Sequence, residues 1–272
     1  MANRNPNIIP YYCSSAQTHL ETIHMPLSSS QYSVISTFLQ EQDMPNLYRS
    51  YTWEGDTWKK GFPDLFRLER EISAAAKRYA INRDHLLQVA EWGKLPNKKG
   101  ISCRSSLKVT LYVDDTPACW LSREPENAVC ILESQIRGFG PTYCSKILHF
   151  AVPQVFGALD TRLVRTFGRG DDRTLHRYQL LDLSVSLSGN RWTIPSSQEG
   201  WPREYGTWVA ILNHIAQTLN RDGIACPHPP CYTESGLREE GMWLPADVET
   251  ALFSYASQQV EGYEKKRVAG TY

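Results

Sequence analysis

Apolar residues recur at intervals of three and four along most of the chain, a spacing typical of amphipathic helices. This pattern predicts helices over residues 31–41, 63–79, 85–92, 126–137, 141–151, 203–220 and 245–257. We expect Asp84 to cap the third of these helices and Gly93 to end it, because such residues favour helix termini. Tyr79 is expected on the buried face of the second helix, and the basic tail at 265–267 is expected to be frayed.

Two stretches depart from helical spacing. Between residues 183 and 194, apolar and polar residues alternate on both sides of Ser188-Gly189-Asn190, which predicts a small peripheral β-hairpin. Residues 105–113 fit a helix and a strand equally well, and residues 1–30 are expected to form an irregular polar arm. The predicted fold class is therefore mainly α, with a small β-hairpin.

The charge balance argues against a protein that binds nucleic acid by bulk charge. The 272 residues include 29 Lys and Arg and 29 Asp and Glu, so the formal net charge is zero. One stretch is nevertheless locally basic, because residues 94–108 contain no acid but carry Lys94, Lys98, Lys99, Arg104 and Lys108. This stretch is either a solvated loop or a surface that contacts phosphates.

The chain has no apolar run of membrane-spanning length, and residues 1–6 lack the pattern of a signal peptide. We therefore expect no membrane association and a cytoplasmic location. Seven scattered cysteines are then expected to be reduced thiols. The run from Cys226 through His228 to Cys231 could begin a zinc site or form a rigid proline-rich loop. Because no second pair of ligands matches it, we predict no metal.

Gly138-Phe139-Gly140 separates two predicted helices. The glycines permit positive φ and close backbone approach, and Phe139 is expected to fill the gap between the helices. Pro141 suits the first turn of the second helix, whose backbone N–H groups could bind a DNA phosphate without reading a base. On its own, the same pattern also fits an ordinary corner between two helices.

Asp160 lies 20 residues after Gly140, at the start of another predicted helix. Aspartate is a common N-cap, so a purely structural role is one interpretation. The spacing, together with the run from Leu159 to Arg162, resembles the helix-hairpin-helix-Gly/Pro-Asp motif of the DNA glycosylase superfamily. The resemblance is specific over residues 126–168, and the superfamily includes endonuclease III, the adenine glycosylases and the 8-oxoguanine glycosylases.

The resemblance implies an enzyme that flips a nucleotide out of DNA into a pocket and breaks its N-glycosidic bond. The helix-capping aspartate is catalytic in that superfamily, so Asp160 is the predicted catalytic residue, which stabilises an oxocarbenium-like cation and can orient the attacking water. The predicted contacts to the DNA backbone are Gly138, Phe139, Gly140, Thr142 and Arg162.

The resemblance also implies two interlocked helical lobes with the base pocket in the cleft between them. Residues 61–168 would form the central lobe, and residues 31–60 and 169–272 the flanking lobe. We expect a monomer without a cofactor. The four-cysteine iron–sulfur signature of endonuclease III is absent from the sequence.

One departure from the family concerns strand cleavage. Members that also cut the DNA strand carry a lysine two residues after the second hairpin glycine, where this chain has Thr142. The matched position therefore predicts a monofunctional enzyme that leaves an abasic site. Lys146, one helical turn further on, could supply the amine instead, contact the flipped base from the pocket that Thr142 also borders, or be solvated.

A second match lies in the last predicted helix. Glu249 and Phe253 occupy positions where 8-oxoguanine glycosylases carry a glutamine that reads the base and a phenylalanine that stacks on it. A spacing of four residues places both on one helix face, although Phe253 could equally be a core residue. An ionised Glu249 would only accept hydrogen bonds and would favour a base that presents N–H donors.

The leading hypothesis is thus a monofunctional DNA N-glycosylase that acts either in base-excision repair of oxidised guanine or against a modified base such as hypermodified cytosine in phage DNA. The alternative from another class is a non-enzymatic helix-hairpin-helix protein that only binds DNA structure. A third possibility is a helical protein whose corner merely resembles the motif.

Overall fold

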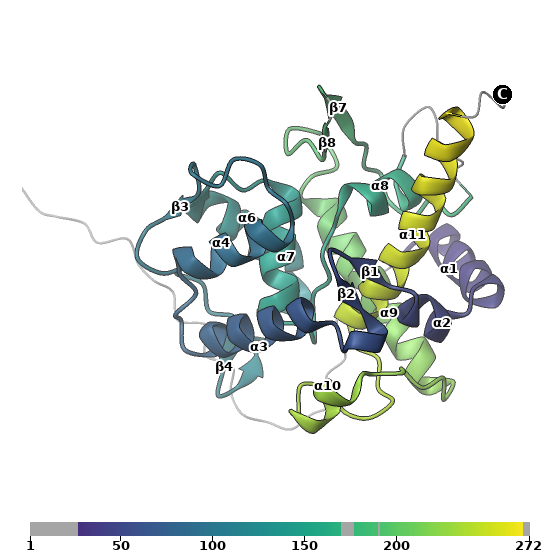
Figure 1. The fold of residues 1–272 in the computed structure, drawn as a ribbon, viewed down its shortest axis with the longest axis horizontal. Coiled ribbons are helices and arrows are strands. Elements are labelled where there is room, and N and C mark those ends of the chain that lie inside the picture. The colour runs from purple at the N-terminus through teal and green to yellow at the C-terminus, as the bar shows by residue number, and fades with distance from the viewer. Residues whose placement is uncertain (1–26, 170–176, 190, 269–272) are drawn as a thin grey trace, which may run out of the picture.

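The computed structural model describes residues 27–169, 177–189 and 191–268, with side chains up to residue 262. Within these ranges the fold is mainly helical, as the spacing of apolar residues predicts, and the strands form short antiparallel pairs (Figure 1). Most of the arm predicted at residues 1–30 lies outside the described residues. The six cysteines within the described ranges are free thiols.

The helices match most of the predicted ones within a few residues. They are α1 (Ser29–Glu41), α2 (Met44–Arg49), α3 (Pro63–Lys77), α4 (Arg83–Trp92), α5 (Trp120–Arg123), α6 (Pro125–Gln135), α7 (Pro141–Ala151), α8 (Thr161–Phe167), α9 (Arg203–Arg221), α10 (Pro230–Glu234) and α11 (Pro245–Val268). A short 3-10 helix, η1 (Trp58–Lys60), precedes α3. The sequence did not predict α2, α5 and α10, because six residues or fewer are too few to show a helical period.

Three details of the predicted helices are wrong. Asn82, not Asp84, caps α4, because its side-chain oxygen accepts hydrogen bonds from the N–H groups of Asp84 (3.0 Å) and His85 (3.4 Å). Tyr79 lies beyond the end of α3 with a φ of +54° and is 50% exposed. The tail expected to be frayed is helical, since α11 continues to Val268.

The described strands form four antiparallel pairs: β1 (Thr52–Trp53) with β2 (Asp56–Thr57), β3 (Ser102–Cys103) with β6 (Ile136–Arg137), β4 (Tyr112–Val113) with β5 (Thr116–Pro117), and β7 (Ser186–Ser188) with β8 (Arg191–Thr193). The last pair confirms the predicted hairpin. The ambiguous stretch 105–113 is mostly irregular and contains only β4. The prediction of helix through residue 137 is also wrong, because residues 136–137 pair with β3 instead.

Two groups of helices meet around a continuous apolar core (Figure 1). In one group α7 packs against α3, α4 and α6, and in the other α11 packs against α2, α8 and α9. The contact between α6 and α9 joins the groups. Phe38, Phe167 and Tyr255 connect α1, α8 and α11 through edge-to-face and tilted ring contacts. Among the described helices, none is long and apolar enough to cross a membrane.

Candidate active site between the glycine hairpin and the last helix

The Gly138–Gly140 corner contacts residues 94–108, which we call the basic loop. Gly138 has a φ of +89°, and a Cβ atom there would lie 3.0 Å from the carbonyl oxygen of Gly100, so a glycine is required. Phe139 is buried with its ring 5.2 Å from that of Tyr143. Gly140 is exposed, and a Cβ atom there would meet nothing within 4 Å. The backbone that leads into α7 is therefore open to solvent on this face.

Positive charge surrounds this corner. Ser102 pairs with Arg137 in the β3–β6 register, which places the basic loop directly beside the corner. Lys99, Arg104 and Arg137 are all exposed. In contrast, the ammonium group of Lys98 is paired with the carboxylate of Glu91, which belongs to α4. The chain thus has a local basic face although its net charge is zero. Both interpretations of residues 94–108, a solvated loop and a surface that contacts phosphates, stay open.

Asp160 caps α8, as the sequence predicts. Its Oδ1 atom accepts a hydrogen bond from the backbone N–H of Arg162 at 2.7 Å, so Oδ2 is left to face the interior. The preceding backbone is tied to α7, because the buried hydroxyl of Ser145 accepts a hydrogen bond from the N–H of Leu159 at 2.9 Å. The carboxylate is therefore held by two helices, and its side chain is 14% exposed.

Lys146 reaches Asp160 from α7. Its Nζ atom lies 3.8 Å from Asp160 Oδ2 and 5.0–5.8 Å from the ring centroids of Trp53, Trp92 and Tyr143. Burial lowers the pKa of Lys146, while the neighbouring Asp160 carboxylate acts in the opposite direction. The aromatic faces also favour the ammonium form. The interpretation of Lys146 as a solvated side chain is wrong, and the amine and base-contact interpretations stay open.

A small cavity lies at this point, lined by side chains from four separate parts of the sequence. Its walls include Tyr51, Trp53, Trp92, Lys146, His149, Asp160, Glu249 and Phe253. The cavity leaves about 20 Å³ for the centre of a water-sized sphere, which is room for one water but not for a nucleobase. Movement of a wall residue is therefore necessary before a base can occupy it.

The aromatic wall is fixed by a chain of hydrogen bonds. The indole N–H of Trp53 donates to the carbonyl oxygen of Trp92 at 2.9 Å, and the indole N–H of Trp92 donates to Asp56 Oδ2 at 3.0 Å. Asp56 Oδ1 in turn accepts a hydrogen bond from the N–H of Asp64, in the first turn of α3. Asp56 is buried and orients Trp92 without reaching the cavity itself.

Arg162 lies at the mouth of the cavity instead of at the glycine corner. Its guanidinium lies over the rings of Trp53 (5.1 Å) and Phe253 (5.4 Å), whose centroids are 6.0 Å apart. Arg162 and Trp53 are partly exposed, so the cavity meets solvent here. A planar cation thus lies against both aromatic rings.

Glu249 and His149 form a buried pair on the opposite wall. Glu249 Oε2 lies 3.3 Å from His149 Nδ1, an atom for which the described residues provide no hydrogen bond. Burial lowers the pKa of His149 to about 3 and, together with Asp160, raises the pKa of Glu249 well above its usual range. Burial therefore favours the protonated acid of Glu249 over the ionised carboxylate considered from the sequence. A protonated carboxyl both donates and accepts, as a glutamine amide does.

The structure brings together most of the predicted site residues. Asp160, Lys146, Glu249 and Phe253 share one cavity, whereas Thr142 is half-buried in the first turn of α7 and does not line it. Sequence reasoning missed Tyr51, Trp53, Trp92 and His149. His149 had a signal, since it follows Lys146 by three residues on the same helix face. The aromatic residues had none, because Tyr51 and Trp53 come from short or irregular segments and Trp92 from the end of a predicted helix, all far away in sequence.

In the run from Cys226 through His228 to Cys231, the two cysteines do not come together. Cys231 Sγ donates to the carbonyl oxygen of Gly61 at 3.4 Å and does not join Cys226. Cys226 and His228 instead lie next to Asp247, and the three side chains are the group of potential metal donors within the described residues.

Comparisons of this chain with protein-family models, with curated proteins and with solved structures found no match. A functional assignment must therefore come from the residues of the cavity and of the surface around it.

Proposed function

We propose that this protein is a monofunctional DNA N-glycosylase with Asp160 as its catalytic carboxylate. One observation carries the proposal: Asp160 is held at a helix N-terminus in an aromatic-lined cavity, and α7, which supplies Lys146 to that cavity, begins at an exposed glycine corner with a basic surface. The proposed partner is DNA, bound by a monomer in the cytoplasm without a cofactor.

The basic face around Gly140 suits binding of the phosphate backbone. The N–H of Thr142 at the start of α7 and the exposed Lys99, Arg104 and Arg137 would hold the strand without reading sequence. The cavity mouth at Arg162 would then receive a flipped nucleotide. Arg162 would leave the rings of Trp53 and Phe253 and contact a phosphate, while the base stacks in its place.

The chemical step needs a negative charge next to C1′ of the flipped nucleotide. The bond from C1′ to the base nitrogen breaks, and its electron pair leaves with the base. Asp160 Oδ2 would stabilise the oxocarbenium-like cation, since Oδ1 is already held by the Arg162 N–H. A water then bonds to C1′, and its proton passes to Asp160 or to solvent. The product is an abasic site with an intact strand.

Glu249 is suited to read the edge of the base. As a protonated acid it offers one donor and one acceptor, so it does not restrict the substrate to bases that present only N–H groups. Both substrate classes, oxidised guanine in repair and a hypermodified cytosine in phage defence, carry such mixed edges. The choice between them is an outcome of the test below.

The test is release of free base, detected by mass spectrometry, from DNAs that contain 8-oxoguanine, uracil, alkylated purines, or hydroxymethylated and glucosylated cytosine. We expect wild type to release one base, with strand breaks only after alkali. Asp160→Asn should bind the same DNA and release nothing measurable. Asp43→Asn is the matched control, because Asp43 caps α2 in the same way outside the cavity.

Two results would overturn the proposal. Equal base release by wild type and Asp160→Asn would remove the catalytic role of Asp160. DNA binding by wild type with no release from any DNA of the panel would favour the non-enzymatic binding protein instead.

A further inference from the structure

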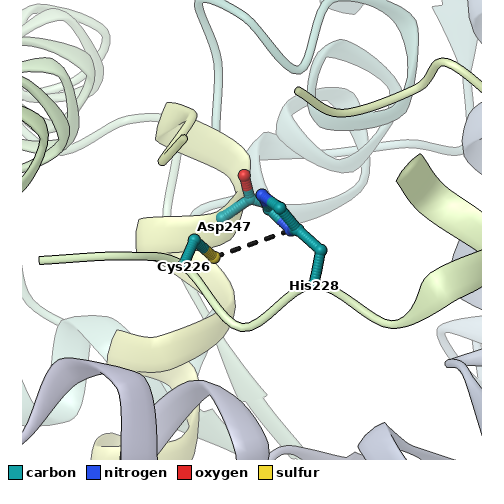
Figure 2. Close-up of side chains that lie close together, drawn as sticks. All are labelled: Cys226, His228 and Asp247. Atoms are coloured by element: carbon teal, nitrogen blue, oxygen red, sulfur yellow. Dashed lines mark hydrogen bonds between the residues drawn. The ribbon is translucent and has the colours of Figure 1, made fainter. Parts of the chain in front are cut away.

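Three donor groups meet where the connection between α9 and α11 crosses the first turn of α11. They are the thiol of Cys226, the imidazole of His228 and the carboxylate of Asp247, and their donor atoms all lie within 4.8 Å of one another. Figure 2 shows the three side chains converging, with Cys226 Sγ 3.6 Å from His228 Nδ1. Cys226 and Asp247 are buried, and His228 is half-buried.

The imidazole of His228 is oriented as in a metal site. Its Nε2 atom lies 2.7 Å from the carbonyl oxygen of Met242. Because a carbonyl only accepts, Nε2 carries the proton and the lone pair of Nδ1 faces Cys226. A carbonyl that holds the second ring nitrogen is the usual support of a ligating histidine. In a tetrahedral zinc site, bonded sulfur and nitrogen atoms lie about 3.5 Å apart.

Hydrogen bonds hold the carboxylate of Asp247 beside Cys226 and His228. Arg238 Nε donates to Oδ1 at 2.9 Å and to Oδ2 at 3.0 Å, and the N–H of Leu244 donates to Oδ2 at 2.9 Å. Oδ1 therefore accepts one hydrogen bond and keeps a lone pair for a cation.

The surrounding charges favour a cation as well. Arg238 also binds Glu69, so two buried carboxylates share one guanidinium. A divalent ion bound by one thiolate adds a single positive charge and balances this cluster, and buried charge is costly when it is left unbalanced. Without a metal, the same balance requires a proton on one of the two carboxylates.

We propose that Cys226, His228 and Asp247 bind one zinc ion, with a water as the fourth ligand. A sulfur, nitrogen and oxygen donor set suits zinc, which replaces the thiol proton when it binds. The ion would fasten the loop at residues 226–228 to α11, the helix that carries Glu249 and Phe253. The indole N–H of Trp58 donates to the carbonyl oxygen of Pro227, so the same loop is also connected to η1.

The test is the metal content of protein purified without a histidine tag. We expect about one zinc per chain in wild type, since the site takes a single ion, and a loss of at least about fivefold in Cys226→Ser. Cys231→Ser is the matched control and should keep its zinc, because Cys231 is five residues away and bonds Gly61 instead. Metal content does not depend on base release, so it can fail or succeed separately from the proposed function.

A second measurement keeps the test decisive if Cys226→Ser does not fold. Cobalt added to zinc-free wild type should give the visible bands of a tetrahedral site and a sulfur-to-cobalt charge-transfer band, and His228→Gln should weaken them. Removal of zinc should lower the melting temperature by about 5 °C. Wild type that holds no zinc and gives no cobalt bands would overturn the proposal, as would loss of zinc in Cys231→Ser with retention in Cys226→Ser.

Discussion

Two buried clusters of charged side chains meet on α11, and they differ in how many hydrogen bonds their members make. Around Asp247, Arg238 makes hydrogen bonds to both Asp247 oxygens and pairs with Glu69, and the N–H of Leu244 adds a further bond. Around Glu249, two residues later, the partners are distant or missing. His149 Nδ1 has no hydrogen bond from the described residues, and Lys146 is 3.8 Å from Asp160.

The difference separates a structural cluster from a reactive one. Hydrogen bonds to both carboxylate oxygens fix the geometry of Asp247, whereas buried groups with few hydrogen bonds are held in place by the fold around them. The Asp247 cluster is expected to govern stability, and the Lys146–Asp160–Glu249 cluster is expected to govern chemistry. Four substitutions test this contrast.

The largest effect is expected for Arg238→Gln. The substitution leaves Glu69 and Asp247 buried without a cation, and breaking a buried pair in this way costs about 3–5 kcal/mol of unfolding free energy. Urea denaturation followed by circular dichroism measures it. Arg67→Gln on the exposed face of α3 is the control and should change stability by less than about 1 kcal/mol. Similar values for the two variants would contradict a structural role for the Asp247 cluster.

Asp160→Asn is expected to lower the rate of base release while it leaves the stability of the protein nearly unchanged. Asparagine still caps a helix, so the unfolding free energy should change by less than about 1 kcal/mol. The rate of base release should fall by about 100- to 1000-fold or more, because the charge that faces C1′ is lost. Single-turnover release on the substrate found in the panel measures this. A variant that loses stability and activity together would assign Asp160 to the fold alone.

Lys146→Met should show that Lys146 is not there for stability. Burial lowers the pKa of Lys146 in the folded protein, so between that value and the ordinary one the unfolded chain binds the additional proton. The stability of wild type should therefore rise relative to Lys146→Met as pH increases. Denaturation of both proteins at about pH 7 and about pH 9.5 gives the difference. A constant difference would mean that folding does not shift the pKa of Lys146, and a difference that falls with pH would mean that the fold stabilises its ammonium form.

The smallest effect is expected for Glu249→Gln. Burial favours the protonated acid, and the amide has the same shape and hydrogen-bonding capacity, so stability should change by less than about 1 kcal/mol. Asp247→Asn, two residues away, makes the same chemical change where both oxygens accept hydrogen bonds, and should cost more. Parallel thermal melts compare them. Equal losses would mean that Glu249 is ionised and paired like Asp247.

The predictable part of this molecule is local. Spacing of apolar residues was enough for the long helices, and Asp160 was recognisable as a helix cap because capping depends on a few adjacent atoms. Glu249 and Phe253 could be placed on one face for the same reason. The failures at Asp84 and Tyr79 are also local, since a one- or two-residue shift of a helix end changes which residue caps it.

The unpredictable part depends on contacts between distant segments. Trp53 belongs to a strand of two residues, and nothing near it in the sequence points to Lys146 or Phe253. The raised pKa of Glu249 follows from burial and from the nearby Asp160 carboxylate, and no single window of sequence contains both residues. Asp247 could not be paired with Cys226 either, because 20 residues and a short helix separate them.

The walls of the cavity are far apart in sequence, so the ribosome synthesises them at different times. A ribosome adds Tyr51 and Trp53 about 200 residues before Phe253, which at ordinary rates of synthesis is roughly 10–40 s earlier. During that interval the glycine corner and Asp160 can fold, but the wall supplied by α11 does not yet exist. A nascent chain therefore has its exposed basic surface well before it has the complete cavity.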